Sequence, residues 1–436
     1  MLSTISFCYK YLRGVGNANT KGGRLLISRE LPSLRQLRAF EAVSRLESVS
    51  AAAREINLSQ PGVTQAIHAL EERVNAPLFE RRQTGCYVTE LGAVLVPRVR
   101  LFFAHLHAAL ADLGPISSAG RQSINAIVNR ITGPQLRSLI AISENPSFDA
   151  AARSLQISEP SLHRSARDFE RDVRRSLYRR SAHGMTTTPY GTELARRCQV
   201  AQQEIAYGLE EMEAARGNIV SRIAIGNIPH SATQVLSNAV RELLSKYPTA
   251  RVQIVDNHYE NLLNDLRAGK LDLLFGVLRR PDWATDAKEE LLFANHYVVV
   301  ARIGHPLLKI KRPTLRDLSR YDWIMPGPMA PRQKALRSLL ESRSTKPNVS
   351  IETTSLQIYR TILSATDQLT LMSQCEAQLN APESLTVLPF SSRHLRRFDG
   401  IATRTDWRPT SIHLQFVDLL RAQASRLSKD LRSMAA

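Results

Sequence analysis

Near the N-terminus, the chain shows the hydrophobic periodicity of a small three-helix unit. Apolar residues recur every three or four positions from Leu34 to Leu46, which predicts a helix with one buried face. Ser48 is suited to cap a second, alanine-rich helix over residues 49–56. A third helix is predicted to begin at Ser59, with a buried face formed by Val63, Ile67, Leu70 and Val74.

A hairpin and a long helix are predicted to follow these three helices. Residues 78–82 and 87–89 favour two short strands on either side of a polar tip around Gly85. From Thr89, a helix is predicted to run to about Leu113. Three helices followed by a short hairpin are the elements of a winged helix-turn-helix.

The whole pattern is repeated ninety-nine residues later. Residues 36–98 and 135–197 share 21 identities in 63 aligned positions, where unrelated segments would share only a few. The matches include the Ala-Ala-Ala-Arg run at residues 51–54 and 150–153, and Gly92 with Gly191. We call residues 31–113 copy one and residues 131–216 copy two. Because there are only two copies and the period is long, this is a duplicated domain rather than a solenoid.

After Gly217, the pattern changes to alternating strands and helices. Buried-strand patterns at residues 222–228, 251–255 and 271–276 are separated by amphipathic helices, which predicts a parallel α/β sheet. The helices expected in this half cover residues 232–246, 259–268, 331–343, 356–365 and 411–431. The later strands expected cover residues 297–301, 323–325, 349–352, 370–372, 386–388 and 401–403.

Composition narrows the class of protein. A chain of 436 residues with 43% hydrophobic residues has room for two or three globular domains. It has no unbroken apolar run approaching the ~18 residues of a membrane span. Its four cysteines form no CxxC pair, which argues against a disulfide framework or a zinc site and fits a reducing cytoplasm. Residues 1–30 are interpreted as a disordered basic arm or an over-long start.

The net charge of +18 suggests a polyanionic partner, and nucleic acid is the first candidate. The excess does not lie where a DNA-binding domain would need it. Residues 31–112 carry only +1 and residues 130–216 only +2, whereas residues 217–436 carry +10. The geometry of the helices must therefore carry the case for DNA binding.

In copy one, the helix that begins at Ser59 is predicted to turn a polar face outward. Two helices joined by a short turn, the second with a polar face, are the arrangement that fits a DNA major groove. Arginines of the wing would meet phosphates. The expected DNA contacts are Ser59, Gln60, Pro61, Gly62, Thr64, Gln65 and His68 of the helix and Arg81 and Arg82 of the wing. The alternative is a helical module that only dimerises.

Specific segments of copy one resemble the DNA-binding domain of LysR-type transcriptional regulators. They are LRQLRAFEAV, the AAAR run, SQPGVTQAIHALE, LFERR and TELG. In that family, a long linker helix follows the domain and pairs two subunits, and residues 89–113 match it. The family norm is a single such domain, so the tandem pair is the main departure.

Copy two resembles the same pattern but departs at its third helix. The family's usual Ser-Gln-Pro is Ser158-Glu159-Pro160, which places a carboxylate where the helix would face phosphates or bases. Glu159 is interpreted either as lost affinity or as a changed base preference through cytosine N4. DNA binding and a protein-interaction role both remain open for copy two. Its candidate DNA contacts are Ser158, Glu159, Ser161, His163, Arg164, Arg167, Arg179 and Arg180.

The C-terminal half resembles the LysR-type effector domain in LRAGKLDLLFG and in GHPL, which follows VVVAR. The resemblance implies a two-lobed α/β fold of the periplasmic-binding-protein type. Pro229-His230-Ser231 and residues 321–326 are most similar to the branch that regulates sugar and aromatic-acid catabolism. The candidate effector contacts are Asn227, His230, Ser231, His258, Thr354 and Ser355. The alternative is that the two serines are ordinary helix caps and the two histidines are solvated.

The expected architecture is an α/β multidomain chain with two α-rich winged helix-turn-helix domains before the effector domain. These occupy residues 31–90 and 131–189, with linker helices at 89–113 and 188–216, a linker at 114–130 and the effector domain at 220–436. The expected function is a cytoplasmic, DNA-binding transcription regulator controlled by a small molecule and acting as a homo-oligomer, dimer or tetramer. Two DNA-reading domains per chain suggest that a dimer covers the DNA that relatives cover as a tetramer.

A solute-binding protein and an enzyme are the two alternative classes. A solute-binding protein has the same effector fold, but no export signal supports it. For an enzyme, the chain lacks HExxH, GxSxG, a Walker loop and a His/Cys cluster, so no catalytic residue, metal or cofactor is expected.

Overall fold

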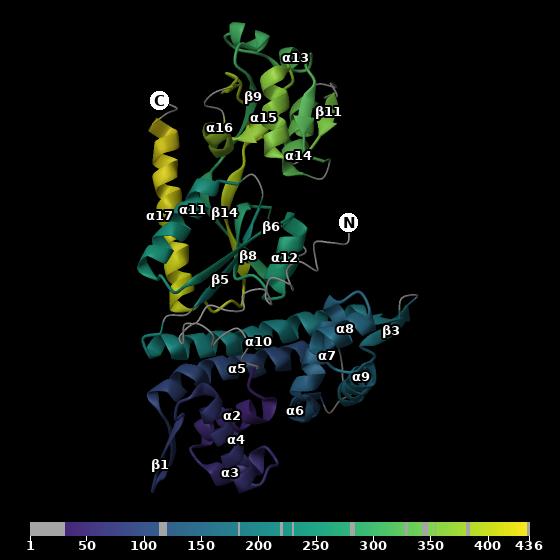
Figure 1. The fold of residues 1–436 in the computed structure, drawn as a ribbon, viewed down its shortest axis with the longest axis vertical. Coiled ribbons are helices and arrows are strands. Elements are labelled where there is room, and N and C mark those ends of the chain that lie inside the picture. The colour runs from purple at the N-terminus through teal and green to yellow at the C-terminus, as the bar shows by residue number, and fades with distance from the viewer. Residues whose placement is uncertain are drawn as a thin grey trace. The chain divides into compact units, whose positions relative to one another are not determined.

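The computed structural model describes residues 31–112, 120–181, 184–218, 221–228, 231–279, 284–327, 330–341, 348–353, 355–380 and 384–433. The chain forms two compact units, Met1–Gly92 and Ala93–Ala436, shown as a ribbon in Figure 1. The expected basic arm, residues 1–30, lies outside the described residues.

The first unit contains the three helices and the wing predicted for copy one. They are α2 (Leu34–Leu46), α3 (Val49–Glu55), α4 (Gln60–Val74), β1 (Phe79–Arg82) and β2 (Gly85–Val88). Serines 33, 48 and 59 cap the three helices, each accepting a backbone N–H three residues later. Such a cap contributes about 1 kcal/mol to helix stability. The helices enclose one core that includes Val43, Ala52, Val63 and Ile67.

Copy two has the same order of elements in the second unit. After α6 (Gly120–Arg130) come α7 (Gly133–Glu144), α8 (Phe148–Leu155), α9 (Glu159–Val173), β3 (Tyr178–Ser181), β4 (Gly184–Thr187) and α10 (Pro189–Ala215). The sequence pattern did not predict α6, which lies within residues expected to be linker.

Equivalent residues of the two copies make equivalent contacts. Glu71 accepts the N–H groups of Leu78 and Phe79 at 2.7 and 3.2 Å. Ninety-nine residues on, Glu170 accepts those of Leu177 and Tyr178 at 2.7 and 3.1 Å. In each copy, a carboxylate of the third helix therefore anchors the first strand of the hairpin.

The first turn of each long helix passes close to the start of the hairpin. A Cβ atom on Gly92 would lie 2.4 Å from the carbonyl oxygen of Leu78, and one on Gly191 would lie 2.2 Å from that of Leu177. Only glycine fits at these two positions without a backbone shift, which explains why both copies retain it.

The long helix of copy one, α5 (Glu90–Ala111), is apolar and long enough to cross a membrane by length and composition alone. From Ala93 onward it belongs to the second unit, where it lies beside α10 (Figure 1). Its apolar character serves this packing, because one series of its side chains is buried: Leu95, Val99, Phe102, Leu106 and Leu110.

The first lobe of the α/β half is a five-stranded sheet. Its strands are β5 (Arg222–Asn227), β6 (Arg251–Asp256), β7 (Leu273–Val277), β8 (Ala287–Ala294) and β14 (Phe398–Arg404), in the order β6-β5-β7-β14-β8. The helices α11 (Thr233–Lys246) and α17 (Ser411–Ser433) pack with Ile223, Ile225 and Phe275 on one face. Helix α12 (Tyr259–Arg267) packs with Ala224 and Leu274 on the other face.

The three early strands are parallel as expected, but the sheet as a whole is mixed. Strands β6, β5 and β7 are parallel, but β14 runs antiparallel to both β7 and β8. The sequence pattern missed β8, because this edge strand carries Lys288, Glu289 and Glu290 and lacks a clear apolar alternation.

The second lobe holds two smaller sheets. Strands β9 (Tyr297–Arg302), β12 (Thr370–Ser373) and β13 (Leu385–Val387) form an antiparallel sheet, while β10 (Trp323–Met325) and β11 (Val349–Glu352) form a parallel pair. Around them lie α13 (Leu315–Leu318), α14 (Pro331–Glu341), α15 (Leu356–Ala365) and α16 (Gln374–Asn380), with 3-10 turns η1 (Pro306–Lys309) and η2 (Arg393–Leu395). Trp323 is fully buried in the core of this lobe.

Candidate nucleic-acid interface and effector cleft

Helix α4 of copy one has one buried face and one polar, exposed face. Val63, Ile67 and Leu70 are buried against the other helices. On the opposite face, Gln60, Pro61, Gln65 and His68 are exposed, while Thr64 is half-buried. Ser59 stands exposed at the helix start, where its hydroxyl accepts the N–H of Gly62 at 3.2 Å.

The expectation that Gly62 faces outward is wrong. This residue is buried, and a Cβ atom there would lie 2.9 Å from Nη2 of Arg35. Arg35, an exposed residue of α2, thus brings a guanidinium to the N-terminal turn of α4. Sequence reasoning missed Arg35, because nothing in the pattern of α2 places its second residue beside another helix.

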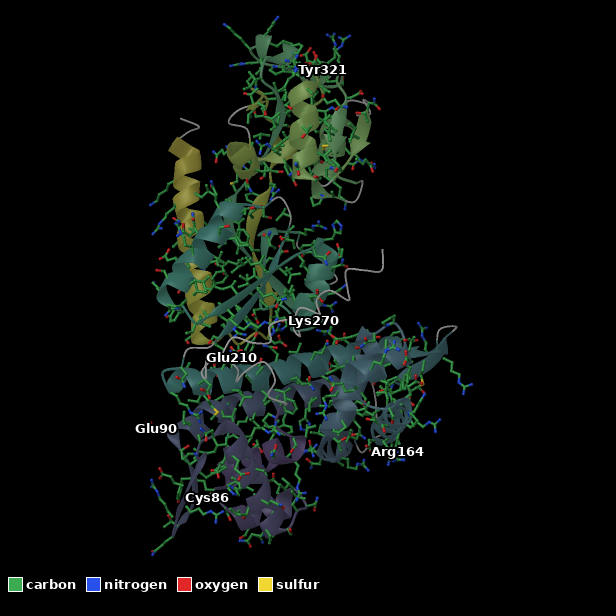
Figure 2. All side chains as sticks on the ribbon, in the orientation of Figure 1. Cys86, Glu90, Arg164, Glu210, Lys270 and Tyr321 are labelled. Carbon is green, nitrogen blue, oxygen red and sulfur yellow. The ribbon has the colours of Figure 1, made fainter. Side chains whose placement is uncertain are left out.

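The wing presents two exposed arginines, Arg81 and Arg82. The guanidinium of Arg82 donates to Glu80 at 3.0 Å and lies 5.5 Å from the ring centre of Tyr87. Cys86, labelled in Figure 2, is buried on the opposite strand of the hairpin. Arg81 lies directly opposite Cys86 and shares its face of the hairpin, whereas Arg82 points to the other face.

Copy two presents a more basic third helix. Arg164 and Arg167 are exposed on α9, and Figure 2 labels Arg164 there. Ser158, Glu159 and Ser161 are exposed around the start of the same helix. Two wing arginines, Arg179 and Arg180, are exposed as well.

His163 differs from the other candidates of α9. Its ring stacks on that of Phe148 with the centroids 4.1 Å apart, and the side chain is half-buried. Packing against α8 thus already accounts for one face of this imidazole, which leaves Arg164 and Arg167 as the prominent side chains of the surface.

Two candidate effector residues lie at the carboxyl ends of the parallel strands, where α/β sheets bind ligands: Asn227 ends β5 and Ser231 follows it. Asn227 donates from Nδ2 to Asp256 at 2.6 Å, while its Oδ1 is buried without a hydrogen-bond partner among the described residues. Ser231 is 5% exposed, and its Oγ also has no partner in the described part of the chain. A Cβ on Gly276 of β7 would lie 2.3 Å from that Oγ.

The two candidate serines differ in role. Ser355 caps α15 by accepting the N–H of Ile358 at 3.4 Å. This is the role of an ordinary helix cap, which was the alternative to an effector contact. Ser231 is not a cap, because the N-cap of α11 is Ala232. His258 is exposed at the start of α12 and makes no side-chain cap bond. His230 and Thr354 lie outside the described residues.

The connections between the two lobes share a buried polar cluster that sequence reasoning missed. Asn295 donates from Nδ2 to Asp399 at 2.7 Å and accepts the N–H of Cys375 at 3.2 Å. Arg397 donates to Asp399 through Nε at 3.1 Å. Because these groups are buried and satisfy one another, they fix the point where the chain passes from lobe to lobe.

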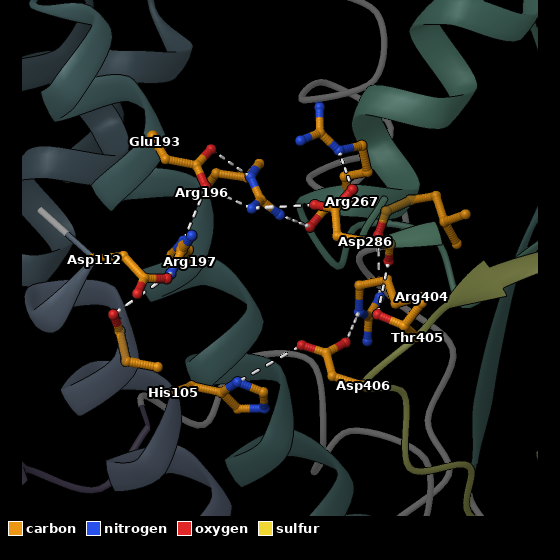
Figure 3. Close-up of polar contacts among 12 residues, drawn as sticks. His105, Asp112, Glu193, Arg196, Arg197, Arg267, Asp286, Arg404, Thr405 and Asp406 are labelled. Atoms are coloured by element: carbon orange, nitrogen blue, oxygen red, sulfur yellow. Dashed lines mark hydrogen bonds and ion pairs between the residues drawn. The ribbon is translucent and has the colours of Figure 1, made fainter. Parts of the chain in front are cut away.

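The first lobe contacts α5 and α10 through polar and charged side chains, drawn in Figure 3. Arg196 of α10 donates to the carbonyl of Arg267 at 2.7 Å and lies 3.3 Å from Asp286. His105 of α5 lies 3.7 Å from Asp406. These side chains border a cavity of about 300 Å³. The described residues contain no group of three His, Cys, Asp or Glu side chains placed to hold a metal ion.

Two family models match most of this chain. The one described as "Bacterial regulatory helix-turn-helix protein, lysR family" matches residues 34–93 and again residues 134–192. The one described as "LysR substrate binding domain" matches residues 216–425. The matches thus cover both copies and the α/β half.

Individual proteins agree with these models. The HTH-type transcriptional regulator GalR of Pseudomonas putida is 28% identical over 382 residues, covering 87% of this chain and 94% of the relative. GbpR of Rhizobium radiobacter is 26% identical over 255 residues, covering 56% of this chain and 82% of the relative. A full-length OxyR variant from Pseudomonas aeruginosa has the same fold, with a TM-score of 0.51 and 19% identity over 68% of this chain and 95% of its own.

Proposed function

The chain belongs to the LysR family of transcriptional regulators, and from that premise we propose that both of its copies bind DNA under the control of a small molecule. As a LysR-type transcription regulator, it combines a helix-turn-helix with an effector-binding domain. The finer assignment is two winged helix-turn-helix domains at residues 31–90 and 131–189, each followed by a linker helix, and an effector domain at residues 220–436.

The observation that carries the proposal is the two-sided character of α4. Its apolar side is fixed in a trihelical core, so its polar side is held rigidly outward. A rigid helix with an exposed polar face is the element that enters a major groove. Gln65 and His68 would meet base edges, and Arg81 and Arg82 would bind phosphates on either side.

Helix α9 supports the same role for copy two. Arg164 and Arg167 occupy the places of Gln65 and His68 in the repeat and are exposed. Arginine forms the commonest specific contact with guanine in the major groove. A second candidate role, protein interaction alone, is favoured by Glu159, whose exposed carboxylate at the helix start would repel phosphates.

The effector would bind beyond the carboxyl ends of β5 and β7. Asn227 Oδ1 and Ser231 Oγ are buried and find no partner among the described residues, so they offer an acceptor and a hydroxyl to a ligand. A sugar or an aromatic acid has the hydroxyl or carboxylate groups that such atoms bind. The protein would act in the cytoplasm as a homo-oligomer, without catalysing a reaction.

Substituting Arg164 and Arg167 with alanine tests whether copy two binds DNA. Each lost phosphate contact should lower the slope of log affinity against log salt concentration by about 0.9, and lost base contacts should lower affinity by about 1–3 kcal/mol each. The matched control replaces Arg316 and Arg320, two exposed arginines of the second lobe. If affinity and salt slope equal those of the control, copy two serves interaction only.

A further inference from the structure

Two equivalent ion pairs join the long helices α5 and α10. Arg98 of α5 donates to Glu211 of α10 at 2.5 Å, and Arg197 of α10 donates to Asp112, directly after α5, at 2.5 Å. Residues ninety-nine positions apart are equivalent in the repeat, so Arg98 corresponds to Arg197 and Asp112 corresponds to Glu211. When residue i contacts residue j and the equivalent of j contacts the equivalent of i, the interface has two-fold symmetry. The two copies therefore pair, through their long helices, as the subunits of a dimer do.

The two helices run antiparallel. Leu95 and Arg98, near the start of α5, lie beside Gly208 and Glu211 near the end of α10, while Asp112 meets Arg197 at the other end. A Cβ on Gly208 would lie 2.8 Å from Cδ1 of Leu95, so the helices approach closely there. Within the second unit, Ala93 of α5 and Pro189, the first residue of α10, therefore lie at opposite ends of the helix pair.

The two-fold symmetry is broken where the first lobe docks. Arg98 also donates to Glu204 at 2.7 Å and to the carbonyl of Arg408 at 2.9 Å. The repeat equivalent of Glu204 is His105, which lies 3.7 Å from Asp406 instead of pairing with Arg197 (Figure 3). Since each break involves a residue of the segment after β14, the lobe lies against one side of an otherwise symmetric pair.

From this internal symmetry, and resting on the DNA binding proposed above, we propose that a single chain reads two half-sites as an intramolecular dimer. An antiparallel helix pair related by a two-fold axis presents its two DNA-reading domains to half-sites in inverted orientation. The recognised DNA is therefore a duplex with two inverted half-sites bound by one chain.

The two half-sites differ in sequence, because the two reading helices differ. Copy one offers Gln65 and His68 where copy two offers Arg164 and Arg167. Glutamine pairs with adenine in the major groove, and arginine pairs with guanine. The half-site bound by copy two should be the richer in guanine, so the operator is an imperfect inverted repeat.

The first test measures stoichiometry on duplexes selected by the purified full chain. With duplex in excess, the ratio expected by sedimentation or native mass is one chain per duplex, so a homodimer would carry two duplexes, each with both half-sites protected by the same chain. Scrambling one half-site should weaken binding by about 100-fold, since the second domain acts at a high effective concentration. A five-base-pair insertion, which turns the half-sites to opposite faces, should do the same. Two chains per duplex, or indifference to the insertion, would overturn the proposal.

The second test breaks and restores the repeated ion pair. Asp112 has a largely exposed side chain, so Asp112→Lys removes one pairing with little risk to the core. We expect it to reduce the preference for the two-half-site duplex over a single half-site by about tenfold or more, and Asp112→Lys with Arg197→Glu to recover it. The control is Asp418→Lys, which breaks an exposed pair with Arg421 on α17. A preference unchanged in Asp112→Lys contradicts the intramolecular dimer.

The two proposals fail in different ways. If alanine at Arg164 and Arg167 leaves every duplex affinity unchanged, copy two does not read DNA and the proposed function falls. If these substitutions weaken binding while each duplex carries two chains, copy two reads DNA and only the intramolecular dimer falls.

Discussion

Tyr207 of α10 donates a hydrogen bond from its hydroxyl to the buried carboxylate of Asp272, which directly precedes β7 in the first lobe. The same carboxylate accepts the N–H of Ala224 at 2.6 Å and lies 3.3 Å from Nε2 of His413. Burial opposes the charge of Asp272, but His413, Ala224 and Tyr207 together hold its pKa below the usual range. A buried polar network thus joins the helix pair to the sheet that is proposed to bind the effector.

Replacing Tyr207 with phenylalanine should destabilise the protein by about 1–3 kcal/mol, because Asp272 loses a donor that water does not replace in a buried site. Urea denaturation measures the loss. Tyr247→Phe is the matched control, since the hydroxyl of Tyr247 donates to Gln415 at the surface. Equal unfolding midpoints for the two variants would contradict a structural role for the buried bond.

Glu210 of α10 should make stability depend on pH. Burial raises the pKa of this carboxyl to about 8, so the folded chain holds a proton that the unfolded chain releases near pH 4.5. The stabilisation is complete below that lower value and is lost as pH rises to about 8, by up to about 1.4 kcal/mol per pH unit. Glu210→Gln should flatten the decline in unfolding free energy between pH 5 and pH 8. A decline as steep as in the wild type contradicts this assignment.

Alanine should destabilise the protein much more at Gly92 and Gly191 than at Gly62. Gly92→Ala forces a methyl group against a backbone oxygen and should cost about 1–3 kcal/mol, and Gly191→Ala should behave alike in copy two. Gly62→Ala meets only the end of the Arg35 side chain and the Ser59 hydroxyl, so its cost should be smaller. Thermal unfolding of the three variants checks the order, and the reverse order would contradict the packing described.

The salt dependence of DNA affinity should distinguish the base-contacting residues of copy one from the phosphate-contacting ones. Gln65→Ala should cost about 1–3 kcal/mol on the preferred DNA and relax specificity at one position. Arg81→Ala should weaken binding to all sequences and lower the salt slope by about 0.9. Binding to specific and random duplexes over a range of salt concentrations measures both. The same loss on random DNA for Gln65→Ala would place that residue on the backbone instead.

The two serines near the proposed effector site should differ in stability. Ser355→Ala removes a helix cap and should cost about 1 kcal/mol. Ser231→Ala removes a buried hydroxyl with no partner among the described residues, so its cost should be near zero. The ligand readout is the rise in melting temperature with a panel of sugars and aromatic acids, where only Ser231→Ala should abolish an observed shift. If both variants keep the shift in melting temperature, Ser231 does not contact the effector.

The periodic elements were predictable from the sequence, because helical spacing and caps are local signals. The bounds of α2 match the prediction, and α4 and the wing match closely. Strand β8, with its charged face, and the short helix α16 lack such signals and were missed. The antiparallel course of β14 was missed because strand direction depends on where the chain returns to the sheet, and no local pattern records that.

The site was predictable where exposure follows from periodicity, and unpredictable where distant residues meet. Gln65 and His68 are exposed because Val63 and Ile67 are buried on the same helix. The cluster of Asn295 and Asp399 joins residues far apart along the chain, so only the folded structure brings it into view. The repeat revealed that Arg98 and Arg197 are equivalent, but not that their helices pair.

Placing both halves of the helix pair in one gene frees them to change separately. In a homodimer, every substitution appears twice, so a residue adapted to one environment must also suit the other. Here Arg98 is almost fully buried beside the effector half, whereas Arg197, its duplicate, keeps about a third of its side chain in water. Separate copies therefore let Arg98 bind the carbonyl of Arg408 in the effector half, while its duplicate Arg197 binds Asp112 and Glu193 of the helix pair.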